Sequence, residues 1–74
     1  MRLKINGEER ELPGPIGLLE FLRSKEIDPR FIVVEHNGTI LRRGDYGDVT
    51  LNEGDVVEIV HMMGGGQEGR SMQP

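Results

Sequence analysis

The sequence predicts an α+β domain in which a mixed sheet of roughly four to five strands packs on one helix. Asn-Gly dipeptides at residues 6–7 and 37–38 each follow a strand-like segment, and this dipeptide favours type I′ hairpin turns. Residues 16–25, between the two turns, have apolar side chains at helical spacing. Residues 56–60 form a further apolar segment of strand length. Together these features predict two hairpins, one crossover helix and a final strand.

The chain begins with the first predicted hairpin. Residues 2–5 alternate charged and apolar side chains, which places Leu3 and Ile5 on one face of a strand. The dipeptide at residues 6–7 supplies the two positive φ angles of a type I′ turn. Residues 8–12 return as a polar strand, which we expect at an edge of the sheet.

A helix is predicted to follow the proline-rich residues 13–15. Proline has no N–H to donate, so strand pairing ends here, and Pro15 suits the first position of a helix with Gly14 as its cap. We expect the apolar stripe of residues 16–25 to be core, because a sheet of this size needs a cover on one face. The stripe consists of Leu18, Leu19 and Leu22, widened by Phe21.

The middle of the chain contains the predicted central strand. Pro29 disfavours helical backbone at Asp28, so residues 26–30 are a connection. Residues 31–35 are β-branched and almost continuously apolar. Such a run is typical of a strand that is buried on both faces, or of one whose second face binds a partner. A short return strand at residues 39–41 follows the second Asn-Gly turn.

The segment after this hairpin is expected to be largely irregular. Residues 42–48 contain two glycines around Tyr46, and we expect this tyrosine to close one end of the core. Residues 49–51 are a strand fragment, and residues 52–55 are a turn.

The last predicted strand, residues 56–60, has a clear facing. Because Glu58 is expected to face water, period-two alternation places Val57 and Ile59 on the core face and Val60 on the open face. The strand leads directly to the glycine run of residues 64–66.

Composition excludes several classes of function. The chain has 74 residues, a net charge of −4 and no cysteine, so it offers no disulfide or thiolate metal site, as is compatible with a cytoplasmic protein. Nucleic-acid binding is not expected, because phosphate contacts need clustered Lys and Arg. No segment approaches the roughly 20 apolar residues of a membrane span. Protein partners are the expected class.

No catalytic or metal site is expected on the body of the chain. His36 and His61 are the only imidazoles, and neither has the sequence neighbours of a metal site or a catalytic triad. The glycines at residues 64–66 lack the Lys-Ser/Thr and helix of a phosphate-binding loop. We therefore expect no catalytic residue, no bound metal and no bound cofactor.

The order of elements predicts a ubiquitin-like β-grasp domain over residues 1–63, followed by a flexible tail over residues 64–74. Pattern alone would also allow a ferredoxin-like fragment or a small barrel. The chain resembles the ThiS family of sulfur carriers over residues 1–66. The resemblance rests on Asn6-Gly7-Glu8, Leu18-Leu19, Leu22, Val34-Glu35-His36-Asn37-Gly38, Arg42, the run Gly54-Asp55-Val56-Val57-Glu58-Ile59-Val60, and Gly64-Gly65-Gly66.

The resemblance implies a function in thiamine thiazole biosynthesis. The carboxylate of Gly66 would be adenylated with ATP by a ThiF-type enzyme and converted to a thiocarboxylate with a sulfur-donating enzyme. Gly64 and Gly65 would let the tail reach the active sites of that enzyme and of thiazole synthase, ThiG. Apolar residues of the open face or near the glycines would dock these partners: Val60, Ile32, Val34 and Met62.

The sequence departs from the family pattern after Gly66, where residues 67–74 follow. These residues are interpreted as a native tail that a protease removes; a cloning remnant and a protein that has left the pathway are the alternatives. Three other functions compete with the sulfur carrier of thiamine synthesis. They are a MoaD-like small subunit of molybdopterin synthase, a ubiquitin-like modifier joined through Gly66, and a plain interaction module.

Overall fold

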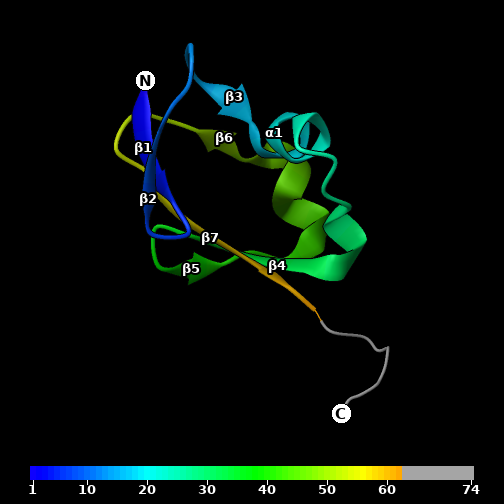
Figure 1. Cartoon of the computed structure of the whole chain (residues 1–74). Coiled ribbons are helices and arrows are strands. Elements are labelled where there is room, and N and C mark those ends of the chain that lie inside the picture. The colour runs from blue at the N-terminus through cyan, green and yellow to red at the C-terminus, as the bar shows by residue number, and fades with distance from the viewer. Residues whose placement is uncertain (63–74) are drawn as a thin grey trace.

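The computed structural model describes residues 1–62 (Figure 1). The first half contains strands β1 (Arg2–Ile5), β2 (Glu8–Glu11) and β3 (Ile16–Gly17), and helix α1 (Leu18–Ser24). The second half contains a 3₁₀ helix (Pro29–Phe31), strands β4 (Ile32–His36) and β5 (Thr39–Ile40), a second 3₁₀ helix (Arg43–Asp48), and strands β6 (Thr50–Leu51) and β7 (Val56–His61).

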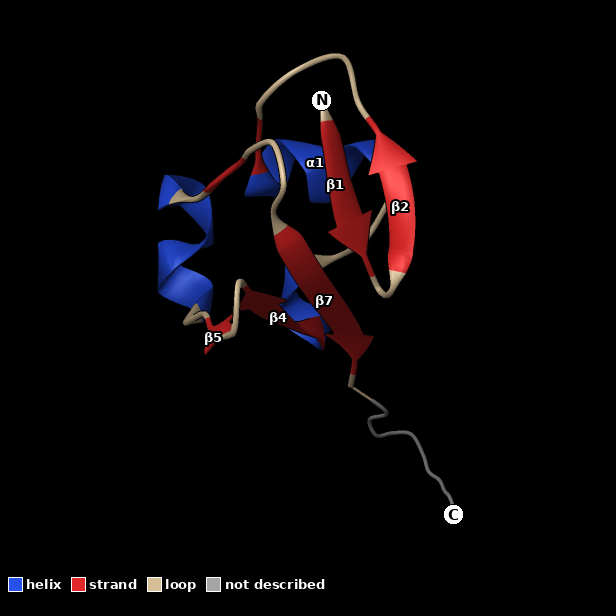
Figure 2. Cartoon of the chain, turned by 90° about the vertical axis from the view of Figure 1, so that its left-hand side faces the viewer, coloured by secondary structure: helices blue, strands red, loops and turns tan. Residues whose placement is uncertain are grey.

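The main sheet has five strands in the order β2-β1-β7-β4-β5. Strands β1 and β7 are parallel, whereas the other neighbouring pairs are antiparallel. In Figure 2, β7 lies between β1 and β4 at the centre of the sheet, with α1 behind it. This mixed sheet on one helix confirms the predicted β-grasp fold, and it makes the last strand the central one.

Both Asn-Gly turns have the predicted backbone, with positive φ at Asn6, Gly7, Asn37 and Gly38. The two asparagines also hold β7. The side-chain Oδ1 of Asn6 accepts a hydrogen bond of 2.7 Å from the Ile59 amide. The Oδ1 of Asn37 accepts one of 2.8 Å from the Val56 amide. The two hairpin turns therefore hold the start and the middle of the strand that leads to the glycines.

One hydrophobic core lies between the sheet and α1. The facing predicted for the last strand is confirmed, because Val57 and Ile59 are buried and Val60 is exposed. Tyr46 is also buried, as predicted, with its hydroxyl 3.5 Å from the carbonyl oxygen of Ile32. The core consists of Leu3, Ile5, Leu18, Phe21, Leu22, Ile32, Val34, Tyr46, Leu51, Val57 and Ile59.

The predicted start of the helix is wrong. The helix does not begin at Pro15 with Gly14 as its cap; it begins at Leu18, with extended Gly17 as its N-cap. The reason is a tertiary contact, since Ile16–Gly17 pairs with Thr50–Leu51 as a two-stranded sheet. Helix propensity at Ile16 is thereby overridden.

Two further boundaries differ from the prediction. Residues 43–48 are not irregular but form a 3₁₀ helix, which buries Tyr46. Phe31 does not begin the central strand, because it ends the 3₁₀ helix that Pro29 starts. The side chain of Asp28 caps this helix by accepting a 2.9 Å hydrogen bond from the Arg30 amide.

Candidate functional site

The end of β7 is the part of the described chain closest in sequence to the glycine run. Val60 is 58% exposed and Met62 is 44% exposed. The Met62 amide donates a 2.8 Å hydrogen bond to the carbonyl oxygen of Phe31, so β4 and its preceding turn hold the chain as far as residue 62. Gly64, Gly65 and Gly66 lie outside the described residues.

Two predicted docking residues do not lie on the open face. Ile32 and Val34 are 1% and 0% exposed, because their side chains point into the core against the helix. The side chain of Val33, which lies between them in the strand, is on the open face instead. Val33 is 36% exposed and lies directly across from Val60 in the ladder between β4 and β7. The open face therefore presents a Val33–Val60 pair.

Two glutamates lie beside this apolar pair on the open face. Glu35 and Glu58 are also directly opposed on β4 and β7, and both alternate with core residues, so their carboxylates share the open face. Within residues 1–62 neither carboxylate forms an ion pair. Opposed like charges on a sheet are destabilising. The centre of the open face is thus an apolar pair beside two carboxylates.

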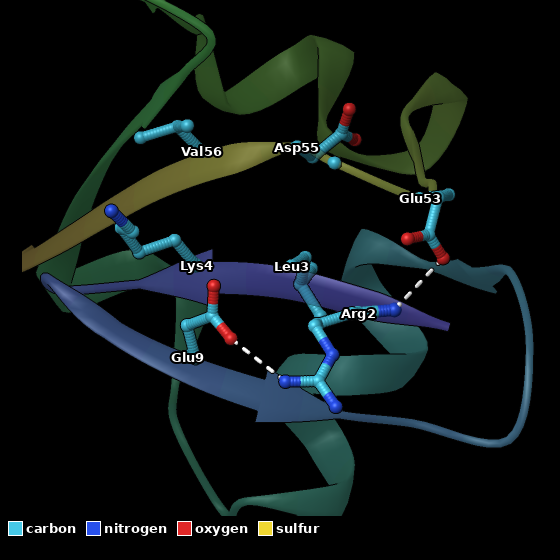
Figure 3. Close-up of a pocket in the computed structure, with 8 residues that line it drawn as sticks. Arg2, Leu3, Lys4, Glu9, Glu53, Asp55 and Val56 are labelled. Atoms are coloured by element: carbon cyan, nitrogen blue, oxygen red, sulfur yellow. Dashed lines mark hydrogen bonds and ion pairs between the residues drawn. The ribbon is translucent and has the colours of Figure 1, made fainter.

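A groove of about 330 Å³ lies beside this face, along the parallel seam between β1 and the start of β7 (Figure 3). The guanidinium of Arg2 donates a hydrogen bond of 2.9 Å to the carboxylate of Glu9. The backbone amide of Arg2 donates one of 2.9 Å to the carboxylate of Glu53. The Arg2 side chain thus lies across the groove and neutralises one of its acids. The lining residues are Arg2, Leu3, Lys4, Glu9, Glu53, Gly54, Asp55 and Val56. They include no cysteine, histidine or hydroxyl side chain.

His36, for which the sequence predicted no catalytic or metal-binding role, belongs to a partly buried polar network. Its Nε2 lies 2.8 Å from Oδ2 of Asp55, which is only 9% exposed. The Asn37 side-chain amide donates to Asp55 Oδ1 at 3.1 Å, and the Asn52 backbone amide donates to Oδ2 at 2.9 Å. Burial raises the pKa of the Asp55 carboxyl, but hydrogen bonds from these three partners lower it below its ordinary value.

Both carboxylate oxygens of Asp55 have hydrogen-bond partners in this network, which connects the turns that precede β5 and β7. We assign it a structural role. Sequence reasoning missed it because its members are separated by up to 19 positions, although the repeated Asn-Gly turn was a signal. His61 lies at the exposed end of β7, as its position predicted.

Within residues 1–62, no group of three or more His, Asp or Glu side chains is placed to hold a metal ion. In the same part of the chain, no helix has the length and apolar character needed to cross a membrane. The described residues present an exposed Val33–Val60 pair and a last strand that is held as far as residue 62.

Comparison with known proteins gives one consistent result. The model of the ThiS family matches residues 3–66. The sulfur carrier protein ThiS of Bacillus subtilis is 34% identical over 65 residues, which is 86% of this chain and 98% of that protein. The crystal structure of the thiamine biosynthesis protein ThiS from Geobacter metallireducens superposes with a TM-score of 0.77 at 32% identity, over 89% of this chain and 100% of that one.

Longer relatives also match. Thiazole synthase of Paramagnetospirillum magneticum is 38% identical over 68 residues, and that of Magnetococcus marinus is 37% identical over 67 residues. These matches cover 92% and 90% of this chain but only 21% of each relative. The chain therefore spans about a fifth of the length of these two proteins.

Proposed function

The chain belongs to the ThiS family, and we propose that it is a sulfur carrier of thiamine biosynthesis rather than an enzyme. One observation supports this most directly: the family match ends at Gly66, the third residue of the glycine run. The same residue is where a carrier needs a carboxylate. The strand that leads to this run, β7, is the central strand of the sheet and is paired on both sides, with β1 and with β4.

The proposed chemistry takes place in partner enzymes. With ATP in a ThiF-type enzyme, a carboxylate oxygen of Gly66 attacks the α-phosphorus, pyrophosphate leaves and an acyl-adenylate forms. Hydrosulfide, HS⁻, released by a sulfur-donating enzyme then adds to the acyl carbon, the C–O bond to AMP breaks, and loss of the S–H proton leaves a thiocarboxylate and AMP. Activation is needed because a carboxylate is a poor electrophile until its oxygen becomes a good leaving group. No acid, base or nucleophile of residues 1–62 is required, and no cofactor bound to the chain is required.

The sulfur acceptor we propose is thiazole synthase. The support is that two thiazole synthases contain a segment similar to nearly all of this chain. A carrier and an enzyme that share one polypeptide in some relatives are expected to meet in others. Gly64 and Gly65, which have no side chains, would let the backbone of the run enter the active sites of both partners.

Val60 and Met62 are the proposed docking residues, and Val33 joins them in place of Ile32 and Val34. Exposed apolar side chains clustered on one face are typical of protein-binding surfaces. Activation of Gly66 also requires that its peptide bond to Gln67 be absent, so we propose that a protease removes residues 67–74. Nothing in the described structure favours a molybdopterin synthase subunit, a modifier or a plain interaction module.

Intact mass of the protein from its native host, grown without thiamine, tests this function. We expect a chain that ends at Gly66, with a fraction showing exchange of one oxygen for sulfur. Recovery of only the 74-residue chain, with no sulfur exchange under conditions that require thiamine synthesis, would exclude the proposal.

A further inference from the structure

A second groove, of about 160 Å³, opens between the end of α1, the β1–β2 turn and the last residues of β7. Its floor is apolar and its rim is polar. The floor consists of Ile5, Phe21, Ile27 and Ile59, and the rim consists of Asn6, Arg10, Lys25 and His61.

The groove exists because α1 is short. The helix has seven residues and ends at Ser24, where Glu26 adopts a positive φ of 58° and turns the chain away. The Ile27 amide then donates to the carbonyl oxygen of Leu22 at 2.9 Å, which closes the helix end. The groove opens beside this helix end, where Phe21 and Lys25 line it together with Ile59 and His61 of β7.

The charge of the rim is opposite to that of the whole chain. Three of the four rim residues are basic and no lining residue is acidic, although the chain has a net charge of −4. Within residues 1–62, Lys25 and His61 form no ion pair, and the Lys25 ammonium lies 6.0 Å from the centre of the Phe21 ring. Arg10 has one exposed contact, at 3.4 Å to Glu8. The rim is therefore suited to carboxylates.

The size of the groove limits the occupant. Small-molecule sites have volumes of roughly 300–1,000 Å³, so a groove of about 160 Å³ fits a single apolar side chain better than a cofactor. Its position limits the partner, because His61 on the rim is one residue from Met62, the last described residue. An enzyme that takes up the residues after Met62 therefore comes close to this rim.

We propose that this groove receives an apolar side chain flanked by carboxylates on a segment of thiazole synthase. The inference rests on the proposed function and extends it, since it adds a docking site on the helix side of β7 to the Val33–Val60 pair on the open side. Apolar contact with the floor would position the segment, and the carboxylates would pair with Arg10 and Lys25. Together the two surfaces would hold β7 from both faces.

The test is a calorimetric titration of the full chain with the thiazole synthase of the same organism at low ionic strength. Lys25→Glu and Arg10→Glu should each weaken binding about tenfold or more, since truncated or reversed charge pairs across an interface are costly. Arg23→Glu is the matched control, because Arg23 is exposed on α1 but does not line the groove. It should change affinity by less than about twofold. Circular dichroism melts should show all three variants folded.

Other results have distinct meanings. If the wild-type chain binds the synthase and both rim variants bind equally well, the groove inference is wrong while the proposed function stands. If the rim variants lose affinity only for the adenylating enzyme, the assignment to thiazole synthase is wrong. If the wild-type chain binds neither enzyme, the proposed function fails and this inference fails with it.

Discussion

The imidazole Nε2 of His36 lies 2.8 Å from Oδ2 of Asp55, and this contact joins the end of β4 to the start of β7. Because Asp55 also accepts hydrogen bonds from Asn37 and Asn52, one carboxylate organises two turns. A buried polar group with all its hydrogen-bond partners makes the fold more specific at little cost in stability. Removing one partner leaves the remaining buried groups without hydrogen bonds.

Asp55→Asn should therefore lower the free energy of unfolding at about pH 7 by about 1–3 kcal/mol. The pKa of Asp55 is lowered in the folded protein. The contribution of the Asp55 carboxylate to the free energy of unfolding is thus complete above its pKa in the unfolded chain, about 3.9. This contribution is lost as the pH falls through the lower pKa of Asp55 in the folded protein. Urea unfolding of both proteins between about pH 7 and pH 2 measures this. The difference should shrink only below about pH 4, and a difference independent of pH would contradict the assignment.

Aspartate scanning of β7 separates stability from binding. Val57→Asp and Ile59→Asp should lower the free energy of unfolding by several kcal/mol, because each buries an unpaired charge. Val60→Asp should leave the protein folded and weaken binding to the ThiF-type enzyme and thiazole synthase. Thermal melts and titration with each enzyme report the two effects. Similar melting temperatures for Val57→Asp and Val60→Asp would contradict the observed facing.

The facing of β7 was predicted correctly from the sequence, whereas that of β4 was not. Glu58 marks the water-facing side of β7, and period-two alternation assigns the other side chains of that strand. The run before Glu35 is apolar at every position, so the run itself marks no face, and a register error of one residue exchanges the two faces. Glu35 was the available marker, because alternation from it places Val33 on the open face and Ile32 and Val34 on the core face. The prediction did not use this marker, so Ile32 and Val34 were placed wrongly and Val33 was missed.

Removing the charge repulsion on the open face should stabilise the fold. Glu35→Gln and Glu58→Gln should each raise the free energy of unfolding by about 0.2–1 kcal/mol. The double variant should gain less than the sum, because either change alone removes the repulsion. Urea unfolding at low salt measures the gain, which should diminish at high salt. Glu20→Gln on the first turn of α1 is the control, and an equal gain there would point to net charge rather than to the pair.

Turn chemistry was the most predictable feature, since both Asn-Gly dipeptides adopt positive φ. The start of α1 and the Asp55 network were not predictable, because both depend on residues distant in sequence. Ile16–Gly17 pairs with residues 50–51, and His36 meets Asp55 only once β4 and β7 are paired. Local propensity contains no information about either contact. The function of the glycine run was predicted from resemblance and order rather than from geometry.

The chemistry should depend on the terminal residues and not on the two histidines. Protein that ends at Gly66, given ATP and a ThiF-type enzyme, should support ATP–pyrophosphate exchange by that enzyme, whereas the 74-residue chain should not. Gly65→Val in the shorter protein should abolish exchange. A β-branched residue adds bulk and restricts the backbone at a position that must enter the active site of the ThiF-type enzyme. His61→Ala should retain exchange, and His36→Ala should retain it at temperatures where the variant is folded. If the uncleaved 74-residue chain proves as active as the shorter one, Gly66 is not the activated carboxylate.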